Sequence, residues 1–414
     1  MQSGRHIDRR AWIILAASVC INLTLGINYS WSIIKKVLIT DWKWTNVDAS
    51  LPYTTYLVVY SVTMVFAGRL QDKIGPRIVI TLGSILVGTG LISCGFTNTL
   101  PYMVSTYAIT GVGYALCFSS TMPVCVKWFP PGNRGLVTGI IVGAAAMASA
   151  YFSPLVNMLI HLYGVHTTFI ILGIGAFTVI AGMAQLLGNP PEYRATQTVP
   201  ARLPAPRPGA RPVLLEVDWH GMIRTGLFYK IWLMFLIAAS SGLMIIGHIA
   251  TIAQTQAEWE NGFYLVILFA AFNSSGRMIA GFLSDRFGRL KILMAVFMLQ
   301  ATNLLFFSSY TSPSLLALGT SVTGLAYGAA FALFPLATAD YYGMKNLGGN
   351  YGLVFTACGC AALLGPIVAG LSADMTGSYV YSYLFAAATF IVAIALGLSI
   401  KPPVKAVQSP VQPT

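Results

Sequence analysis

A basic residue inside a long apolar segment is the first chemically informative feature of the sequence. Arg277 lies in such a segment, eight residues before Asp285 at its end. Eight residues rise about 12 Å along a helix, and half of a bilayer's hydrocarbon core is about 15 Å thick, so a spanning helix would place Arg277 near the midplane. A charge at that depth costs about 2.5–3.5 kcal/mol on the mildest insertion scales, and arginine does not lose its proton. The residue therefore needs a compensating partner.

Arg277 has no acidic partner within the apolar segments, because all twelve Asp and Glu residues fall in loops or at segment ends. A structural arginine satisfied by helix ends or buried groups is one interpretation. We favour a cation that awaits an anion, and the planar guanidinium fork suits a carboxylate. Asn273 precedes Arg277 by four residues, so on a helix it shares the same face and could orient the guanidinium or donate to the substrate.

The composition requires a membrane around these residues. Of 414 residues, 56% are hydrophobic and 9% are charged, whereas soluble domains carry about 25% charged residues. The mean hydropathy of +0.72 points the same way. A spanning helix needs about 20 mostly apolar residues. We predict an all-α membrane protein with twelve such helices, at residues 11–34, 50–70, 77–97, 100–126, 135–160, 167–188, 229–252, 259–283, 290–309, 313–338, 348–371 and 378–400.

The twelve predicted helices fall into two halves. We expect an N-terminal six-helix bundle at residues 1–188 and a C-terminal one at residues 228–414, joined by a linker at residues 189–227. The linker contains seven prolines and five arginines, so an extended, water-exposed tether is expected there. Its last part, Leu214–Arg224, is mildly amphipathic; a plain linker and a segment along the membrane surface are both open interpretations.

The distribution of basic residues predicts the orientation. With the N-terminus in the cytoplasm, 20 of the 24 Lys and Arg residues fall on the cytoplasmic side and three (Lys35, Lys36 and Lys43) on the outer side. The excess of positive charge inside places both termini and the linker in the cytoplasm, in a plasma (inner) membrane protein. The net charge of +12 is then a result of topology, and no nucleic-acid partner is expected.

A loop sequence recurs in the two halves. Residues 68–77 read G-R-L-Q-D-K-I-G-P-R, and residues 281–290 read G-F-L-S-D-R-F-G-R-L. The two glycines and the aspartate of each copy are separated from their counterparts by 213 residues, close to half of 414. An internal duplication explains this constant offset. The glycines allow close approach and a tight turn, and Asp72 or Asp285 could cap the N-terminus of a neighbouring helix.

This repeated pattern resembles the signature loop of the major facilitator superfamily. The resemblance implies two helical bundles related by a pseudo-two-fold axis, with a central cavity that opens alternately to each side. It also implies that the charged residues of the loops form a conformational latch rather than a substrate site. Those residues are Asp72, Arg77, Asp285 and Arg289.

Four further segments resemble the monocarboxylate transporter and oxalate–formate antiporter group of that superfamily. They are residues 26–31 (G-I-N-Y-S-W), 127–139 (K-W-F-P-P-G-N-R-G-L-V-T-G), 273–277 (N-S-S-G-R) and 350–352 (N-Y-G). The resemblance and helical periodicity together imply a mostly apolar substrate pocket that would suit a short-chain acid such as lactate. Its expected lining residues are Arg277, Asn273, Tyr114, Tyr327, Phe331, Asn28, Tyr29, Phe355 and Cys358.

Departures from the family pattern bear on substrate and coupling. Cys358 stands where oxalate antiporters have a second cation, and one cation suits one carboxylate. Asn273 stands where animal monocarboxylate carriers have a proton-accepting aspartate, so the span offers no acid for coupling. The candidates that remain are His248, Glu258 and Glu260, near the outer ends of their helices. For the two glutamates, an ordinary role as loop acids is the alternative interpretation, and the one that we favour.

The sequence therefore predicts a secondary transporter of small monocarboxylates that works by alternating access. Proton-coupled symport is the expected mode, and exchange of one carboxylate for another is the alternative. A membrane-embedded enzyme would need acid–base groups in the spans, and a carboxylate sensor would carry a soluble output domain; neither is expected. We expect no cofactor and no metal, a monomer, and as partners the carboxylate, protons and the lipid bilayer.

Overall fold

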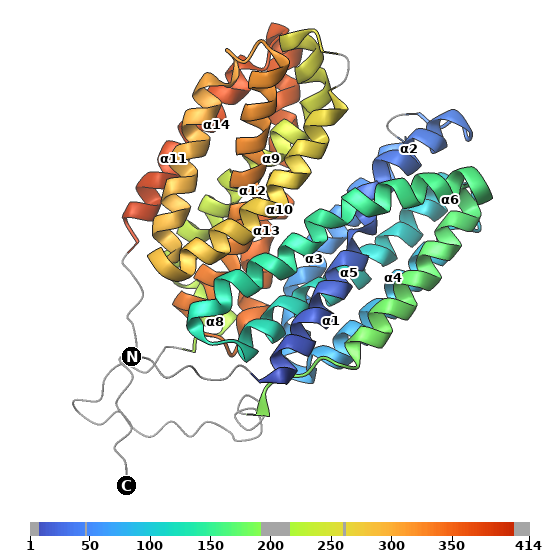
Figure 1. Ribbon diagram of the computed structural model, residues 1–414, viewed down its shortest axis with the longest axis vertical. Coiled ribbons are helices and arrows are strands. Elements are labelled where there is room, and N and C mark those ends of the chain that lie inside the picture. Colours follow the sequence, from blue (N-terminus) through green and yellow to red (C-terminus); the bar gives the residue numbers. More distant parts are fainter. Residues whose placement is uncertain (1–7, 46–47, 192–215, 260–261, 401–414) are drawn as a thin grey trace.

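The structure is a computed structural model that describes residues 8–45, 48–191, 216–259 and 262–400. These residues form helices, turns and loops without a β-strand, so the predicted all-α class is confirmed. Two helical bundles, one from each half of the chain, converge at one end and diverge toward the other (Figure 1). We call the end at which α1 begins and α14 ends the basal end, and the opposite one the distal end.

The first half begins with an interrupted helix. Gly26 lies where this helix meets α6, so closely that a Cβ there would be 1.8 Å from the Cβ of Ala148. The predicted span 11–34 is accordingly an α-helix, a short 3₁₀ segment and a second α-helix. The elements of this half are α1 (Arg9–Leu25), η1 (Gly26–Ser30), α2 (Trp31–Thr40), η2 (Asp48–Ser50), α3 (Leu51–Ile74), α4 (Pro76–Cys94), α5 (Leu100–Trp128), η3 (Pro131–Asn133) and α6 (Arg134–Ala184).

The 51 residues of α6 are two spanning helices rather than one. A continuous helix of that length would extend over about 75 Å, more than twice the hydrocarbon thickness of a bilayer. Gly164 interrupts it with φ 76° and ψ 170°, a conformation that favours glycine. The ribbon turns back at the distal end in Figure 1. The two parts correspond to the predicted spans 135–160 and 167–188.

The second half follows the same plan. Its elements are α8 (Trp219–Ile223), α9 (Gly226–Ala257), α10 (Phe263–Phe287), α11 (Arg289–Phe307), α12 (Pro313–Tyr342), α13 (Leu347–Thr376) and α14 (Val380–Leu398). Among the described residues, eleven helices are long and apolar enough to cross a membrane. Because α6 contributes two spans, these helices account for all twelve predicted segments.

The surface of the bundles is suited to lipid. Large apolar side chains on several helices face outward, including Phe66, Leu318 and Ile391, which are 57–63% exposed. Polar side chains such as Gln300 and Asn303 are instead buried between helices. Burial of the polar groups and exposure of the apolar ones is the arrangement that a hydrocarbon solvent favours.

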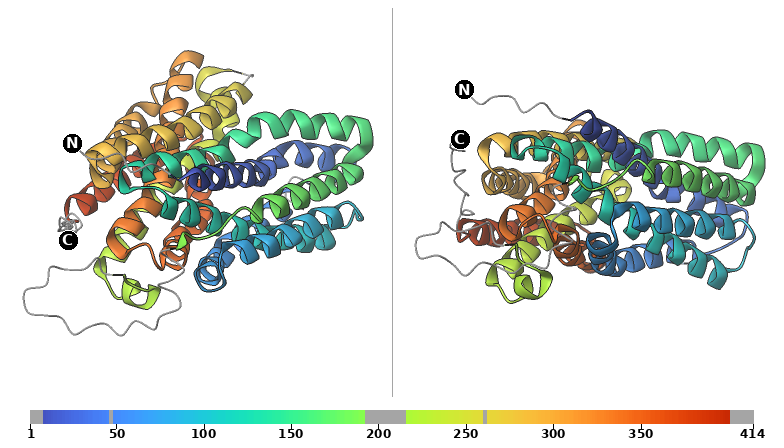
Figure 2. Two further views of the ribbon diagram at one scale, coloured as in Figure 1. Left: turned by 60° about the horizontal axis from the view of Figure 1, so that its bottom comes forward. Right: turned by 90° about the horizontal axis from the view of Figure 1, so that it is seen from below.

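The two halves meet chiefly at two helix crossings, α10 with the first part of α6 and α3 with α13, and α12 also contacts α6. Most of the predicted linker, residues 192–215, lies outside the described residues. The last part differs from the extended tether that the proline content predicts. Residues 216–225 include α8 and lie against the basal end of the second half (Figure 2), where the amide of Val217 donates to the carbonyl oxygen of Tyr342 at 3.0 Å.

Candidate functional site

Arg277 lies where the two halves meet, and its side chain is 3% exposed. Its Nε donates to Oδ1 of Asn273 at 3.0 Å, as the four-residue spacing predicts. One terminal nitrogen donates to the carbonyl oxygen of Val142 in α6 at 2.5 Å, and the guanidinium lies 5.2 Å from the ring centroid of Phe331. None of the ion pairs formed by the described residues includes Arg277. Neutral groups therefore hold this cation in place.

Glycines let the helix of Arg277 approach its neighbours closely. A Cβ at Gly139 of α6 would lie 2.4 Å from the carbonyl oxygen of Arg277, and a Cβ at Gly328 of α12 would lie 2.0 Å from the backbone of α10. Real Cβ atoms do not come that close, so larger residues would push the helices apart. Ser274 adds a hydrogen bond across the first contact, from its Oγ to the carbonyl oxygen of Gly143 at 3.1 Å.

Phe355 in α13 connects the aromatic side chains of the two halves. It is 2% exposed. On the side of the first half its ring centroid lies 5.3 Å from that of Tyr60 and 6.1 Å from that of Phe118. On the side of the second half it lies 6.1 Å from Phe331 and 5.8 Å from Tyr351. A chain of ring contacts thus runs from the first half to the guanidinium of Arg277.

On the basal side of Arg277, Asp285 joins α10 to the first half. Its two carboxylate oxygens accept from the amides of Gly135 and Leu136, at 2.9 and 3.1 Å, at the N-terminus of α6. A terminal nitrogen of Arg289 lies 2.6 Å from the same carboxylate, and its Nε lies 3.4 Å from Asp340. The negative charge of Asp285 is well placed at the positive end of the α6 dipole.

The equivalent residue of the first half, Asp72, makes the same type of contact with α13. One carboxylate oxygen accepts from the amide of Gly349 at 3.0 Å, and Lys127 lies 3.9 Å from the other. The backbones meet one turn earlier, where a Cβ at Gly68 would lie 1.9 Å from the carbonyl oxygen of Gly348. The prediction that each aspartate caps a neighbouring helix is confirmed.

Comparison with known proteins agrees with this architecture. A family model described as "Major Facilitator Superfamily" matches residues 14–299 and 252–413, and so nearly the whole chain. The chain belongs to the major facilitator superfamily. It is therefore a multi-pass membrane transporter and not an enzyme. The family match confirms the resemblance that the signature loops indicated.

Individual relatives and structures extend the match. This superfamily member is 24% identical to the oxalate:formate antiporter of Oxalobacter formigenes, over 97% of this chain and 94% of the relative. It is 24% identical to monocarboxylate transporter 12 of Xenopus laevis, over 80% of this chain and 75% of the relative. Among solved structures, the Escherichia coli fucose:proton symporter FucP shares the fold with a TM-score of 0.70, 13% identity, and coverage of 94% and 99% of the two chains.

Three more of the expected substrate residues lie around the same centre of this major facilitator fold. Tyr327 in α12 lies 4.7 Å from Phe331, ring to ring. Tyr114 in α5 lies 4.9 Å from Tyr60, edge to face. Cys358, half-buried in α13 three residues after Phe355, is within electrostatic reach of the Arg277 guanidinium. The structure therefore brings most of the predicted residues together.

Asn28 is occupied by other protein groups. In η1 it is 7% exposed, its Oδ1 accepts from the hydroxyl of Tyr107 at 3.0 Å, and its Nδ2 donates to the carbonyl oxygen of Leu25 at 3.2 Å. It thus anchors the 3₁₀ segment to α5. The side chain of Tyr29, the neighbouring expected residue, lies outside the described part of the chain.

A cluster of aromatic residues in the first half was not predicted. Tyr56 contacts Tyr60, Tyr107 and Tyr114 with ring centroids 5.5–6.1 Å apart. The signal was present in the sequence: Tyr53, Tyr56 and Tyr60 recur at helical spacing in α3, as do Tyr107, Tyr114 and Phe118 in α5. Through Tyr60 and Phe118 the cluster contacts Phe355 of the second half.

The residues considered for proton coupling lie apart from Arg277. The ring of His248 contacts the carbonyl oxygen of Pro366 at 3.2 Å and the hydroxyl of Tyr379 at 3.3 Å. Glu258 is exposed and ends α9 in a left-handed conformation with φ 49°. Glu260 lies outside the described residues. Of the latch residues, Arg77 is exposed at the beginning of α4, whereas Arg289 is engaged as described above.

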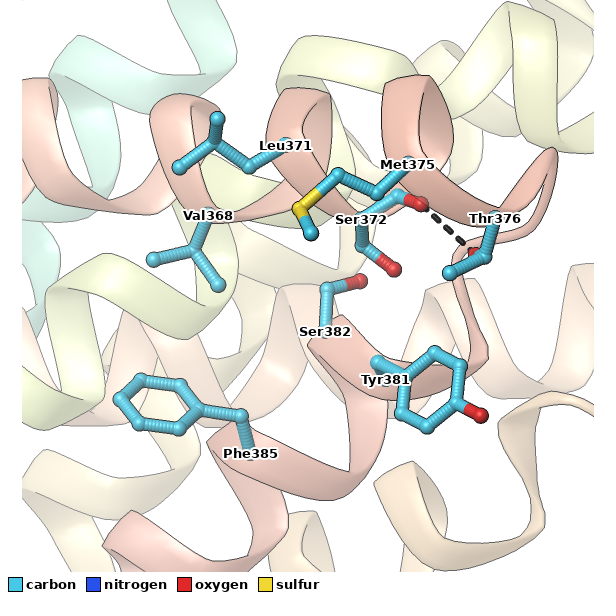
Figure 3. A pocket seen from close by; sticks show the side chains of 8 residues that line it. All are labelled: Val368, Leu371, Ser372, Met375, Thr376, Tyr381, Ser382 and Phe385. Atoms are coloured by element: carbon cyan, nitrogen blue, oxygen red, sulfur yellow. Dashed lines mark hydrogen bonds between the residues drawn. The ribbon is translucent and has the colours of Figure 1, made fainter.

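A pocket of about 410 Å³ lies between the last turns of α13 and the first turns of α14 (Figure 3). Its lining combines apolar side chains with the hydroxyl groups of Ser372, Thr376, Tyr381 and Ser382, and contains no charged residue. None of the expected substrate residues takes part. The lining residues are Val368, Leu371, Ser372, Met375, Thr376, Tyr381, Ser382 and Phe385.

Proposed function

We propose that this protein is a secondary transporter of small monocarboxylates, with Arg277 as the group that binds the carboxylate. The observation that carries the proposal is a buried arginine, oriented by Asn273 and held by neutral groups only, at the contact between the halves. A guanidinium in that setting gains most from an anionic ligand. The names of the relatives, an oxalate:formate antiporter and a monocarboxylate transporter, support the same substrate class.

The surroundings of Arg277 favour one carboxylate over two. Phe331, Phe355 and Tyr327 supply an aromatic, mostly apolar environment. Cys358, three residues after Phe355 in α13, adds no second cation. A dianion would keep one charge without a partner at low dielectric, whereas lactate would bury a small apolar body against the rings. Because all of these residues belong to one chain, a monomer is sufficient for transport.

The two aspartate contacts are the proposed latch of alternating access. In the proposed orientation the basal end is cytoplasmic, since the linker and both chain ends belong to that side by the count of basic residues. Asp72 and Asp285 would then hold the cytoplasmic side closed in the state described here. Opening that side requires both carboxylates to leave the helix N-termini that they cap.

Uptake into proteoliposomes tests the role of Arg277. Arg277→Lys keeps the charge and loses the bidentate fork, so uptake of radiolabelled lactate should fall at least tenfold, on the order of the loss of one strong charge-assisted contact. Arg9→Lys is a matched control outside the site and the signature loops, because Arg9 is exposed at the start of α1. Uptake near the wild-type level in the Arg277→Lys protein would contradict the carboxylate-binding role.

Coupling is tested with the same vesicles. Proton symport predicts lactate accumulation under an inward proton gradient when no carboxylate is present inside. Exchange, the alternative supported by the similarity to an antiporter, predicts uptake only when a carboxylate is loaded inside, whatever the gradient. If symport holds, His248→Gln and Glu258→Gln separate the candidate proton sites: the relevant change should remove gradient dependence and preserve exchange.

A further inference from the structure

The end of the linker is attached to the second half by several hydrogen bonds. The carboxylate of Glu216 accepts from the amides of Lys345 at 2.8 Å and Met344 at 3.4 Å, in the turn between α12 and α13. The carbonyl oxygen of Val217 accepts from Nδ2 of Asn350 at 2.9 Å. These contacts satisfy two backbone amides of the turn that precedes α13 and one side chain in its first turn, so the segment is part of the folded second half rather than a loose connection.

The helix that follows is well defined for its length. The Asp218 side chain accepts from the amide of Gly221 at 2.9 Å, and this hydrogen bond lowers the pKa of the carboxyl. Met222 is fully buried, and the hydroxyl of Thr225 lies 2.7 Å from that of Tyr342. The segment is therefore held at both ends, with Trp219 between them.

From this position Trp219 reaches the first half. The guanidinium of Arg69 in α3 lies 3.7 Å from its ring centroid, a close cation–π distance. Nε of Arg69 is buried and has no hydrogen-bond partner among the described residues. Arg69 precedes Asp72 by three residues, on the same helix face and next to the proposed latch.

The interaction between Glu216 and Lys127 at the crossing of α3 with α13 resembles the one between Asp340 and Arg134 at the crossing of α10 with α6. The repeat offset of 213 pairs Lys127 with Asp340 and Arg134 with Leu347. Asp340 is in electrostatic reach of Arg134 from the opposite half. Lys127, which already lies 3.9 Å from Asp72, is also in electrostatic reach of Glu216. The linker thus supplies a second opposite charge to Lys127. It does so at the crossing where the repeat counterpart of Arg134 is the uncharged Leu347.

We infer that the segment Glu216–Trp219 acts together with the two aspartate contacts, Asp72 and Asp285, to keep the basal end closed. We call this segment the clasp. It remains bound to the second half and releases Arg69 when the halves separate there. The inference rests on the proposed alternating-access function. Because Glu216 is exposed, its attraction for Lys127 is screened, and the larger contribution comes from Trp219 and Arg69.

Hydrogen–deuterium exchange of the full-length protein in detergent or nanodiscs, without substrate, tests the clasp. The informative peptide covers residues 129–137, whose Gly135 and Leu136 amides are capped by Asp285 and do not contact the linker. Trp219→Leu should raise exchange of these amides about twofold to fivefold, the range of an exposed cation–π contact. Trp219→Phe, which keeps a ring, should stay closer to the wild type, and Glu216→Gln should have the smaller effect.

A change on the opposite side of the contact completes the test. Arg69→Gln should reproduce the effect of Trp219→Leu, and the double variant should add little, because both changes remove one interaction. The Arg69 variant also serves if the Trp219 variant does not fold. Faster exchange only at residues 342–350, with the 129–137 peptide unchanged in both single variants, would mean that the segment is merely docked and would overturn the clasp. Since no substrate is present, failure of carboxylate uptake is a separate outcome.

Discussion

The crossing of α10 with α6 and the crossing of α3 with α13 are built alike at the basal end and differently in the middle. At the basal end both have paired glycines and an aspartate that caps the opposite helix. In the middle of the first crossing, Arg277 donates a hydrogen bond to the carbonyl oxygen of Val142. By the offset of 213, the counterpart of Arg277 in the second crossing is Met64, and the counterpart of Val142 is Phe355.

The counterpart of Asn273 is Tyr60, whose ring contacts Phe355. A polar contact in one crossing is therefore replaced by an aromatic one in the other. What the two crossings share is what the fold requires, and the difference marks the residues that the proposed function requires.

Exchanging residues between the crossings should give the largest effect. Arg277→Met should leave a folded protein, as stable as the wild type or more so because a buried cation is removed, while lactate uptake falls to background. Met64→Arg places a cation at a fully buried site. Its neighbour four residues earlier is Tyr60, whereas Arg277 has Asn273 there, so the new cation has no such acceptor and thermal stability should fall. Fluorescence-detected size-exclusion thermal curves and uptake assays check both; a stable Met64→Arg protein would mean that the crossings differ less than described.

The shared glycines come next. Gly281→Ala and Gly68→Ala place a Cβ 2.2 and 1.9 Å from the carbonyl oxygens of Gly135 and Gly348. Either change must separate the crossing helices, so we expect at least a tenfold loss of uptake and a lower melting temperature. Gly182→Ala is the matched control, because a Cβ there meets nothing within 4 Å. Tolerance of one change and not the other would break the equivalence of the two crossings.

The aspartates should differ moderately. Asp285 accepts from two helix amides and pairs with Arg289, whereas Asp72 accepts from Gly349 and has Lys127 at 3.9 Å. Asp285→Asn should therefore slow transport more than Asp72→Asn, by roughly threefold to tenfold if one charge-assisted hydrogen bond makes the difference. Initial uptake rates at saturating lactate measure this. Equal effects would show that the cap alone matters and that the pairing with Arg289 adds nothing.

Phe355 is expected to have the smallest effect. Phe355→Leu keeps an apolar side chain and removes the ring contacts to Tyr60 and Phe331, worth about 0.5–1.5 kcal/mol per pair. The KM for lactate should rise several-fold with a smaller change in maximal rate. Phe385→Leu, at a side chain 58% exposed on α14, is the control. A KM that does not change would place the substrate away from the aromatic contact between the halves.

Much of this organisation could be predicted from the sequence, because it depends on short-range patterns. Apolar segments of sufficient length gave the helices, and the four-residue spacing gave the bond between Arg277 and Asn273. The bond to Val142 could not be predicted, since it depends on which helix crosses α10. The docking of Glu216 depends on free amides in a distant turn, which proline content does not reveal. The opposite charges of Lys127 and Asp340 were open to prediction by applying the offset of 213 beyond the signature loops.

The hydrogen bond from Arg277 to Val142 has a consequence for the return of the unloaded carrier. A peptide oxygen carries only a partial negative charge, so a carboxylate outcompetes it for the guanidinium. With no carboxylate present, the same donor still has an acceptor within the protein. If Arg277 binds the carboxylate as proposed, the carbonyl of Val142 takes the place of the cargo's oxygen in the unloaded protein. The unloaded transporter can therefore change conformation while the Arg277 guanidinium keeps a hydrogen-bond acceptor.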